Sequence, residues 1–307
     1  MISIALNRKH TIRFSIILII IFFFNVQVKS QTGVISKIYT DFGGYWSSTD
    51  GSNTIFPDTS HNVLGFTYNN TLYSTGVNDP VLSANGQTFT AGNWWAFPAI
   101  LSGPVILPLR LNIGSRIDGT TLANIGSHNN VKNLTSESVQ TDGVHGLDIG
   151  TGYANLPANA ISVYPIQAIL SSKISDDEPD ILVTQTAQAA TNGDVFKFLD
   201  AAGNIVGNSL TVMFNTQSVL GNWKIDQHNI FTTLSIPAST STGGVWDINT
   251  QSQIRLIALK LSEFGITSSN YSQVKSFTIV PSGETDISFI AYNASSFNVP
   301  PSIEQNT

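Results

Sequence analysis

The sequence predicts an all-β protein, an antiparallel β-sandwich of the jelly-roll or immunoglobulin-like kind with few short helical turns. Charged residues make up only 11% of the chain, against about 25% in an ordinary soluble domain. Gly, Asn, Ser and Thr take the polar positions instead, and these residues favour turns and form helices poorly. Short runs rich in β-branched and aromatic residues recur between turn signals, which is the pattern of a sandwich or barrel.

The first 30 residues are typical of a secretory signal. Arg8, Lys9 and Arg13 precede the apolar run "FSIILIIIFFFNV" (14–26), and the small residue Ser30 follows. A basic start, an apolar core and a small-residue exit predict a cleaved signal peptide over residues 1–30. An uncleaved N-terminal anchor is the alternative. We therefore expect a secreted or cell-surface protein.

The charge balance excludes some partners. Four of the 14 Lys and Arg and none of the 20 Asp and Glu lie in residues 1–30, so the remaining chain carries a formal net charge of −10. Nucleic-acid binding needs clustered basic residues, and no such cluster remains. We expect no nucleic-acid partner and no membrane insertion of the mature chain. The absence of cysteine removes disulfides and thiolate metal sites, and in an exported chain it favours a bacterial envelope or surface protein.

The strands are predicted in chain order. The first clear hairpin spans 62–77 and turns at Asn69 and Asn70, a pair that suits a tight turn. A second hairpin turns at "DAAGN" within 194–214. A stretch at 261–275 has room for one or two short helical turns capped by Ser262 or Ser268. Further strands are predicted at 160–170, 180–187, 254–261, 274–280 and 286–293.

No linker divides the mature chain, so residues 31–297 are predicted to form a single β-sandwich domain. Sandwiches of this size commonly fold as one unit. The segment "NVPPSIEQNT" turns polar and proline-bearing, which predicts a linker or disordered tail over 298–307.

The histidines and carboxylates show no catalytic pattern. No histidine pair has the H-x-x-x-H or H-E-x-x-H spacing of a zinc hydrolase, and no G-x-S-x-G nucleophile elbow is present. Glycosidase chemistry needs two carboxylates roughly 5–10 Å apart, and the spacing selects none. We assign no catalytic residue, and keep a secreted polysaccharide-degrading enzyme as an alternative function.

The densest acidic run, "ISDDEPDILV", predicts a possible calcium site. Asp176, Asp177, Glu178 and Asp180 stand just before a strong strand, and calcium takes six to eight oxygen ligands from such loops. A solvated turn that protects an edge strand is the alternative. Asp142 and Asp148 in "QTDGVHGLDIGTG" form a secondary candidate.

Aromatic residues beside turns are candidates for stacking on sugar rings. Tyr45 and Trp46 follow a glycine pair, and Trp94 and Trp95 are adjacent in "AGNWWAFPA". Neighbouring residues on a strand point to opposite faces, so at most one of Trp94 and Trp95 faces outward. Burial in the core is the alternative for each tryptophan, since aromatic residues dominate core packing.

The segments "YTDFGGYWSS", "FPDTSHNVLGFTYNNTLYSTGVNDPVL", "DGVHGLDIGTGYANLP", "EPDILVTQTA" and "LSEFGITSSNYSQVKSFTIVPSGETDISFIAYN" together resemble the N-terminal module of secreted, adhesin-like surface proteins of Bacteroidetes, over nearly all of residues 31–295. The resemblance implies that "TDFGGYWSS" is the first strand and its turn, and that "PDTSHN" leads into the hairpin. Such proteins often end in a type IX secretion sorting domain, which does not follow "PPSIEQNT". The chain is then expected to be a fragment, or a module released without that anchor.

These observations together predict a cell-surface binding or adhesion module. Its expected partner is an extracellular polysaccharide or a surface protein, with calcium as a possible support. A structural spacer within a longer surface protein is the third alternative.

Overall fold

The computed structural model describes residues 33–48, 55–58, 60–98, 100–102, 109–113, 140–158, 160–189, 191–230 and 245–300, and for 100–102, 109–113, 225–230 and 245–250 it describes only the backbone. The predicted signal peptide and the end of the predicted tail lie outside these residues. No helix of the described part is long and apolar enough to cross a membrane.

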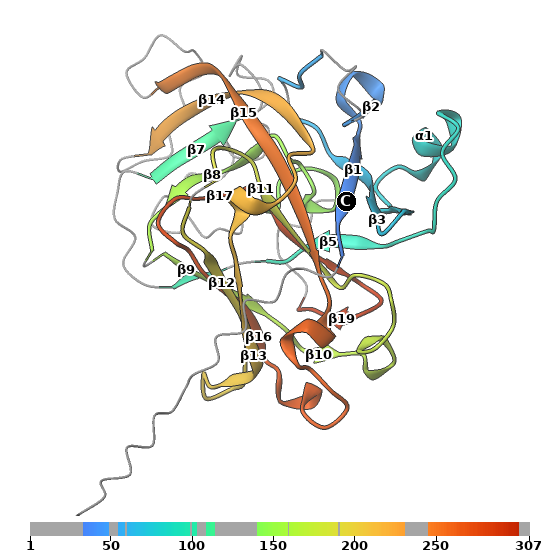
Figure 1. The fold of residues 1–307 in the computed structure, drawn as a ribbon, viewed down its shortest axis with the longest axis vertical. Coiled ribbons are helices and arrows are strands. Elements are labelled where there is room, and N and C mark those ends of the chain that lie inside the picture. Colours follow the sequence, from blue (N-terminus) through green and yellow to red (C-terminus); the bar gives the residue numbers. More distant parts are fainter. Residues whose placement is uncertain are drawn as a thin grey trace, which may run out of the picture.

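The described chain is mostly β-structure and its strands pair antiparallel, which confirms the predicted fold class (Figure 1). A five-stranded sheet has the order β13 (Ile205–Val212), β12 (Asp194–Leu199), β16 (Ser276–Val280), β9 (Ile161–Pro165), β6 (Ile100–Ser102). A four-stranded sheet has the order β2 (Trp46–Ser47), β1 (Ile35–Thr40), β3 (Val63–Tyr68), β4 (Thr71–Ser74). A small sheet pairs β10 (Ala168–Ile169) with β19 (Phe297–Asn298).

An eight-stranded sheet packs against both the five-stranded sheet and the four-stranded sheet. Its order is β17 (Thr285–Ile287), β8 (Thr151–Leu156), β7 (Leu109–Ile113), β14 (Gly221–Ile230), β15 (Val245–Leu259), β11 (Ile181–Gln185), β18 (Ile290–Asn293), β5 (Trp94–Ala96). The long strand β15 pairs with β14 over its first part and with β11 over its second. It therefore holds the two halves of this sheet together.

The eight-stranded sheet is covered on both faces around β11, β15 and β18, so the sandwich gains a third layer. Val183 and Ile257 pack into the core shared with the five-stranded sheet. Leu182, Leu256 and Ala291 point the other way, into the core shared with the four-stranded sheet. Strands buried on both faces need apolar residues at successive positions rather than at alternate ones. This explains the nearly continuous runs "ILV" and "LIAL", whose second packing face the sequence did not reveal.

Both predicted hairpins are present. Asn69 and Asn70 join β3 to β4 with φ of 47° and 67°, and a two-residue type I′ turn requires positive φ at both central residues. The turn between β12 and β13 is held by Asp200, whose Oδ1 accepts the backbone N–H groups of Ala202 and Asn204. Local turn chemistry therefore determined these two connections.

Helical structure in the described residues is limited to α1 (Asp79–Ala84) and short 3-10 turns. The predicted stretch 261–275 contains two such turns, but their N-caps are Lys260 and Asn270 rather than serines. Helix α1 was not predicted; the side chain of its N-cap Asn78 accepts the N–H of Val81. The 3-10 turns are η1 (Phe42–Gly44), η4 (Val144–Gly146), η5 (Ser171–Lys173), η6 (Phe214–Thr216), η7 (Leu261–Phe264) and η8 (Tyr271–Gln273).

Candidate binding groove

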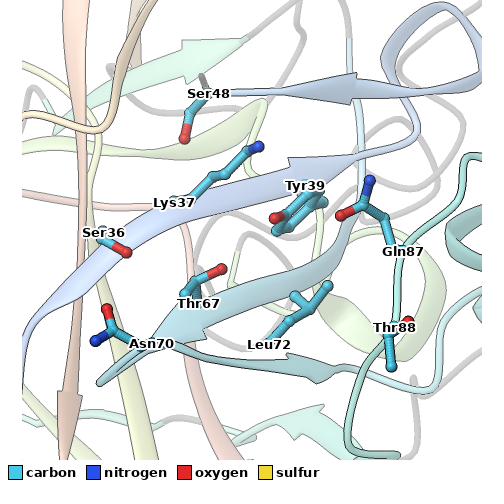
Figure 2. A pocket seen from close by; sticks show the side chains of 9 residues that line it. All are labelled: Ser36, Lys37, Tyr39, Ser48, Thr67, Asn70, Leu72, Gln87 and Thr88. Atoms are coloured by element: carbon cyan, nitrogen blue, oxygen red, sulfur yellow. The ribbon is translucent and has the colours of Figure 1, made fainter. Parts of the chain in front are cut away.

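An open groove of about 640 Å³ lies on the outer face of the four-stranded sheet, the face turned away from the eight-stranded sheet. Figure 2 shows side chains of β1 and of the β3–β4 hairpin gathered along it, with Gln87 and Thr88 of the segment after α1 along one side. The groove is lined by Ser36, Lys37, Tyr39, Ser48, Thr67, Asn70, Leu72, Gln87 and Thr88. Tyr39 and Leu72 are buried beneath it, and the polar residues form its sides.

Strand register brings the central groove residues together. Lys37 on β1 lies opposite Thr67 on β3, and Thr67 lies opposite Leu72 on β4. Residues directly opposite one another in a sheet share a face, so these three side chains form one row across the sheet. A bulge at Ser36 adds a residue to β1 between Ile35 and Lys37. The strand can therefore bury Ile35 in the core and still present Lys37 to the groove.

Several polar side chains of the groove have hydrogen-bonding capacity to spare. Within the described part of the chain, the side chains of Thr67, Asn70 and Thr88 make no hydrogen bond. Ser48 Oγ accepts the N–H of Ile38 at 2.8 Å, which leaves its hydroxyl hydrogen free to donate. These groups can pair with a ligand that carries hydroxyl or amide groups.

Lys37 supplies the positive charge of the groove. Its ammonium lies 4.9 Å from the centroid of the Tyr39 ring, within the range of a cation–π contact. The described lining contains no Asp or Glu, and no ion pair joins Lys37 to another described residue. The amine therefore faces the groove without an internal counter-charge.

Tyr45 lies beside the groove floor, as one member of the predicted aromatic site. Its ring centroid is 6.3 Å from that of Tyr39. Burial raises the pKa of Tyr45, the neighbouring Tyr39 adds to this, and a hydrogen bond with Ser47 works against it. Of the four residues predicted to stack on sugar, Tyr45 is the one near the groove.

Trp46 and Trp94 are core residues in the structure. Trp46 is 6% exposed and its Nε1 donates to the Ile55 carbonyl at 3.0 Å. Trp94 is fully buried and meets the Phe66 ring edge-on at 5.2 Å. Neither indole offers a face to a ligand, which corrects the expectation for these two residues. A tryptophan beside a turn has the same sequence pattern whether it is buried in the core or stacks on a ligand, so the sequence left both alternatives open.

Trp95 points to the other side of β5, as strand alternation requires. It is partly buried and stacks on the imidazole of His145 at 3.7 Å between centroids. The Trp95 Nε1 donates to Asn93 Oδ1 at 2.8 Å, and His145 Nδ1 lies 3.1 Å from the Trp94 carbonyl. Burial lowers the pKa of His145, while the backbone carbonyls of Trp94 and Thr75 oppose this. Trp95 is thus engaged in joining two segments of the fold.

The structure does not bring the acidic run together as one ligand set. Lys173 Nζ lies 3.0 Å from Asp176 and 2.6 Å from Glu178, while Lys260 Nζ lies 3.3 Å from Asp177. These three carboxylates are therefore each paired with a lysine. No group of three or more His, Cys, Asp or Glu in the described ranges is arranged to hold a metal ion.

Asp180, the fourth predicted ligand, turns into the protein. It is 1% exposed, and its two oxygens accept the N–H of Leu261 at 2.7 Å and the hydroxyl of Ser296. Burial raises its pKa to about 7, and those two hydrogen bonds oppose the shift. Asp180 thus ties β11 to the segments after β15 and β18.

The secondary acidic candidate also has a structural role. Asp148 accepts the N–H groups of His61 and Gly150 at 2.8 and 2.7 Å and the hydroxyl of Thr151 at 3.0 Å. Burial and the neighbouring Asp142 raise the pKa of Asp148 to about 7. These contacts connect the segment before the first hairpin to the start of β8.

Comparison of the chain with protein-family models, with curated proteins and with solved structures gives no match. The groove therefore has to be interpreted from its own chemistry. The sequence did not predict Lys37, Thr67 or Thr88 as site residues, because polar residues of strands and loops carry no local signal of which face they share.

Proposed function

We propose that this protein is an exported, non-enzymatic binding module that takes an extracellular polysaccharide in the groove of the four-stranded sheet. What supports the proposal is the groove itself, an open channel in which the side chains of Thr67, Asn70 and Thr88 make no hydrogen bond to a described residue. Sugars present many hydroxyl groups, and such groups pair with Ser, Thr, Asn and Gln side chains. Tyr39 and Leu72 give the channel an apolar floor.

Binding suits this lining better than cleavage does. Hydrolysis of a glycosidic bond uses two carboxyl groups on either side of the bond, whereas the described lining offers hydroxyls, amides and one amine. The openness of the groove is also suited to a chain that passes through it rather than to a small molecule that is enclosed.

The test is a glycan-array screen of the purified protein, followed by titration calorimetry with the saccharides that bind. In the double variant Thr67→Val, Thr88→Val the groove keeps its shape but loses two hydroxyl groups. Each neutral hydrogen bond contributes about 1 kcal/mol, so affinity should fall about tenfold or more. Thr191→Val removes an exposed hydroxyl before β12 in the five-stranded sheet and serves as the matched control.

Two results would contradict the proposal. If no saccharide binds, a surface protein becomes the better candidate partner. If saccharides bind and the double variant binds them as well as the wild type does, the binding site lies elsewhere on the molecule.

A further inference from the structure

We infer that the groove selects acidic saccharides, with the Lys37 ammonium pairing with a negatively charged group on the sugar, a carboxylate or a sulfate. This inference rests on the proposed function and names the class of its ligand. Lys37 lies in the row formed with Thr67 and Leu72. That row crosses the sheet through the groove, so a bound chain passes the amine (Figure 2).

Lys37 lacks a counter-charge among the described residues. Lys173 and Lys260 both pair with carboxylates of the acidic run. Lys37 has no such partner in the described part of the chain, although acidic residues outnumber basic ones. A lysine that faces a polar groove without a carboxylate is free to pair with an anionic group of a ligand.

The Tyr39 ring orients the amine of Lys37. The contact with the Tyr39 ring at 4.9 Å holds the Lys37 side chain over the groove floor. A cation–π contact leaves the N–H donors of the ammonium available. Holding the side chain in place beforehand also reduces the conformational entropy that binding would cost.

The net negative charge of the chain does not oppose this pairing at short range. At physiological ionic strength, charges separated by more than about 8 Å are largely screened. The described groove lining contributes a lysine and no acid, so the local field favours an anionic group. Thr67 and Thr88 then supply hydrogen bonds to the neutral hydroxyl groups of the same chain.

The experiment compares matched acidic and neutral saccharides. The probes are oligogalacturonate and oligoalginate, each with its carboxyl-reduced neutral counterpart, and a sulfated galactan with its desulfated form. Affinities are measured on the purified wild-type protein and on Lys37→Met, which keeps the aliphatic stem, and Lys37→Arg, which keeps the charge. Lys275→Met removes an exposed lysine next to β16 in the five-stranded sheet and is the matched control.

The expected result is that acidic members bind and that their reduced or desulfated forms bind at least tenfold more weakly. Lys37→Met should weaken acidic binding by about tenfold to a hundredfold, the range for a hydrogen bond to a charged group, while Lys37→Arg and Lys275→Met retain it. The carboxylate and sulfate arms identify which anionic group is preferred.

Other results separate this inference from the proposed function. Equal binding of acidic and neutral members, or acidic binding unchanged in Lys37→Met, overturns the selection of acidic sugars. If the Thr67→Val, Thr88→Val variant then loses binding of neutral members, the groove still binds saccharide. Binding of no member by the wild type overturns both.

Discussion

Replacing Asp180 by asparagine tests whether this residue is a buried structural acid rather than a calcium ligand. Its carboxylate accepts the N–H of Leu261 and the hydroxyl of Ser296. In Asp180→Asn, the amide oxygen can still accept from Leu261 and the NH₂ group can donate to Ser296 Oγ, because the hydroxyl hydrogen rotates. The variant keeps the shape and the hydrogen bonds and loses only the titrating proton.

The expected effect follows from the raised pKa. The pKa of Asp180 is about 7 in the folded protein and about 3.9 in an unfolded chain, so the folded state binds the proton more tightly. The resulting stability is fully present below about pH 4 and is lost as the pH rises to about 7. At about 1.36 kcal/mol per unit, the contribution of Asp180 to the free energy of unfolding should fall by about 2–3 kcal/mol between pH 5 and pH 8. Over this interval Asp180→Asn should therefore lose about 2–3 kcal/mol less than the wild type does.

The assay is urea unfolding of the wild type and the variant at pH 5 and at pH 8, with free energies taken from linear extrapolation. Asp148 and Asp286 also have pKa values raised by burial to about 7, and since both proteins contain them, their contributions cancel in the comparison. Asp177→Asn, which alters a fully exposed side chain of the same run, should keep the wild-type dependence on pH.

Equal pH dependence in the wild type and in Asp180→Asn would refute the reasoning, since it would mean that Asp180 does not titrate in this interval. A loss of several kcal/mol at both pH values would refute it in another way. That outcome would show that the charged carboxylate is needed, as a bound cation would require.

Two further predictions concern the remaining sequence candidates. Trp46→Ala should lower the free energy of unfolding by about 3–5 kcal/mol, the range for buried aromatic residues, in urea titrations followed by circular dichroism; unchanged stability with lost saccharide binding would instead make Trp46 a ligand residue. Because Lys173 and Lys260 pair with the carboxylates of Asp176, Asp177 and Glu178, millimolar calcium or chelator should leave the melting temperature of the purified protein unchanged, whereas a melting temperature that rises with calcium concentration would support the calcium site.

Much of the local structure could be predicted from the sequence. The pair Asn69 and Asn70 tolerates positive φ, so the first hairpin and its register followed from two adjacent residues. Strand alternation likewise required Trp94 and Trp95 to face opposite sides, and they do. These features depend on residues that are neighbours in the chain, and the local sequence therefore predicts them.

The candidate site was predictable only in small part. Tyr45 was singled out and lies next to the groove floor, but Lys37, Thr67 and Thr88 were not. Their assembly depends on the pairing of β1 with β3 and on the approach of the segment after α1. A polar residue on a strand has the same local sequence pattern whether the sheet face that it belongs to is covered, exposed or part of a groove.

The sequence by itself determined the β class, the two hairpins and the shortage of helix, because turn residues and strand periodicity act over a few positions. The tertiary structure decided the third layer, the groove and the partners that the carboxylates of the acidic run contact. Lys260 and Asp177 are 83 residues apart, and Asp180 and Ser296 are 116 apart. Whether a carboxylate meets a lysine, a hydroxyl or a cation depends on which distant segments pack beside it, and only the folded chain brings those segments together.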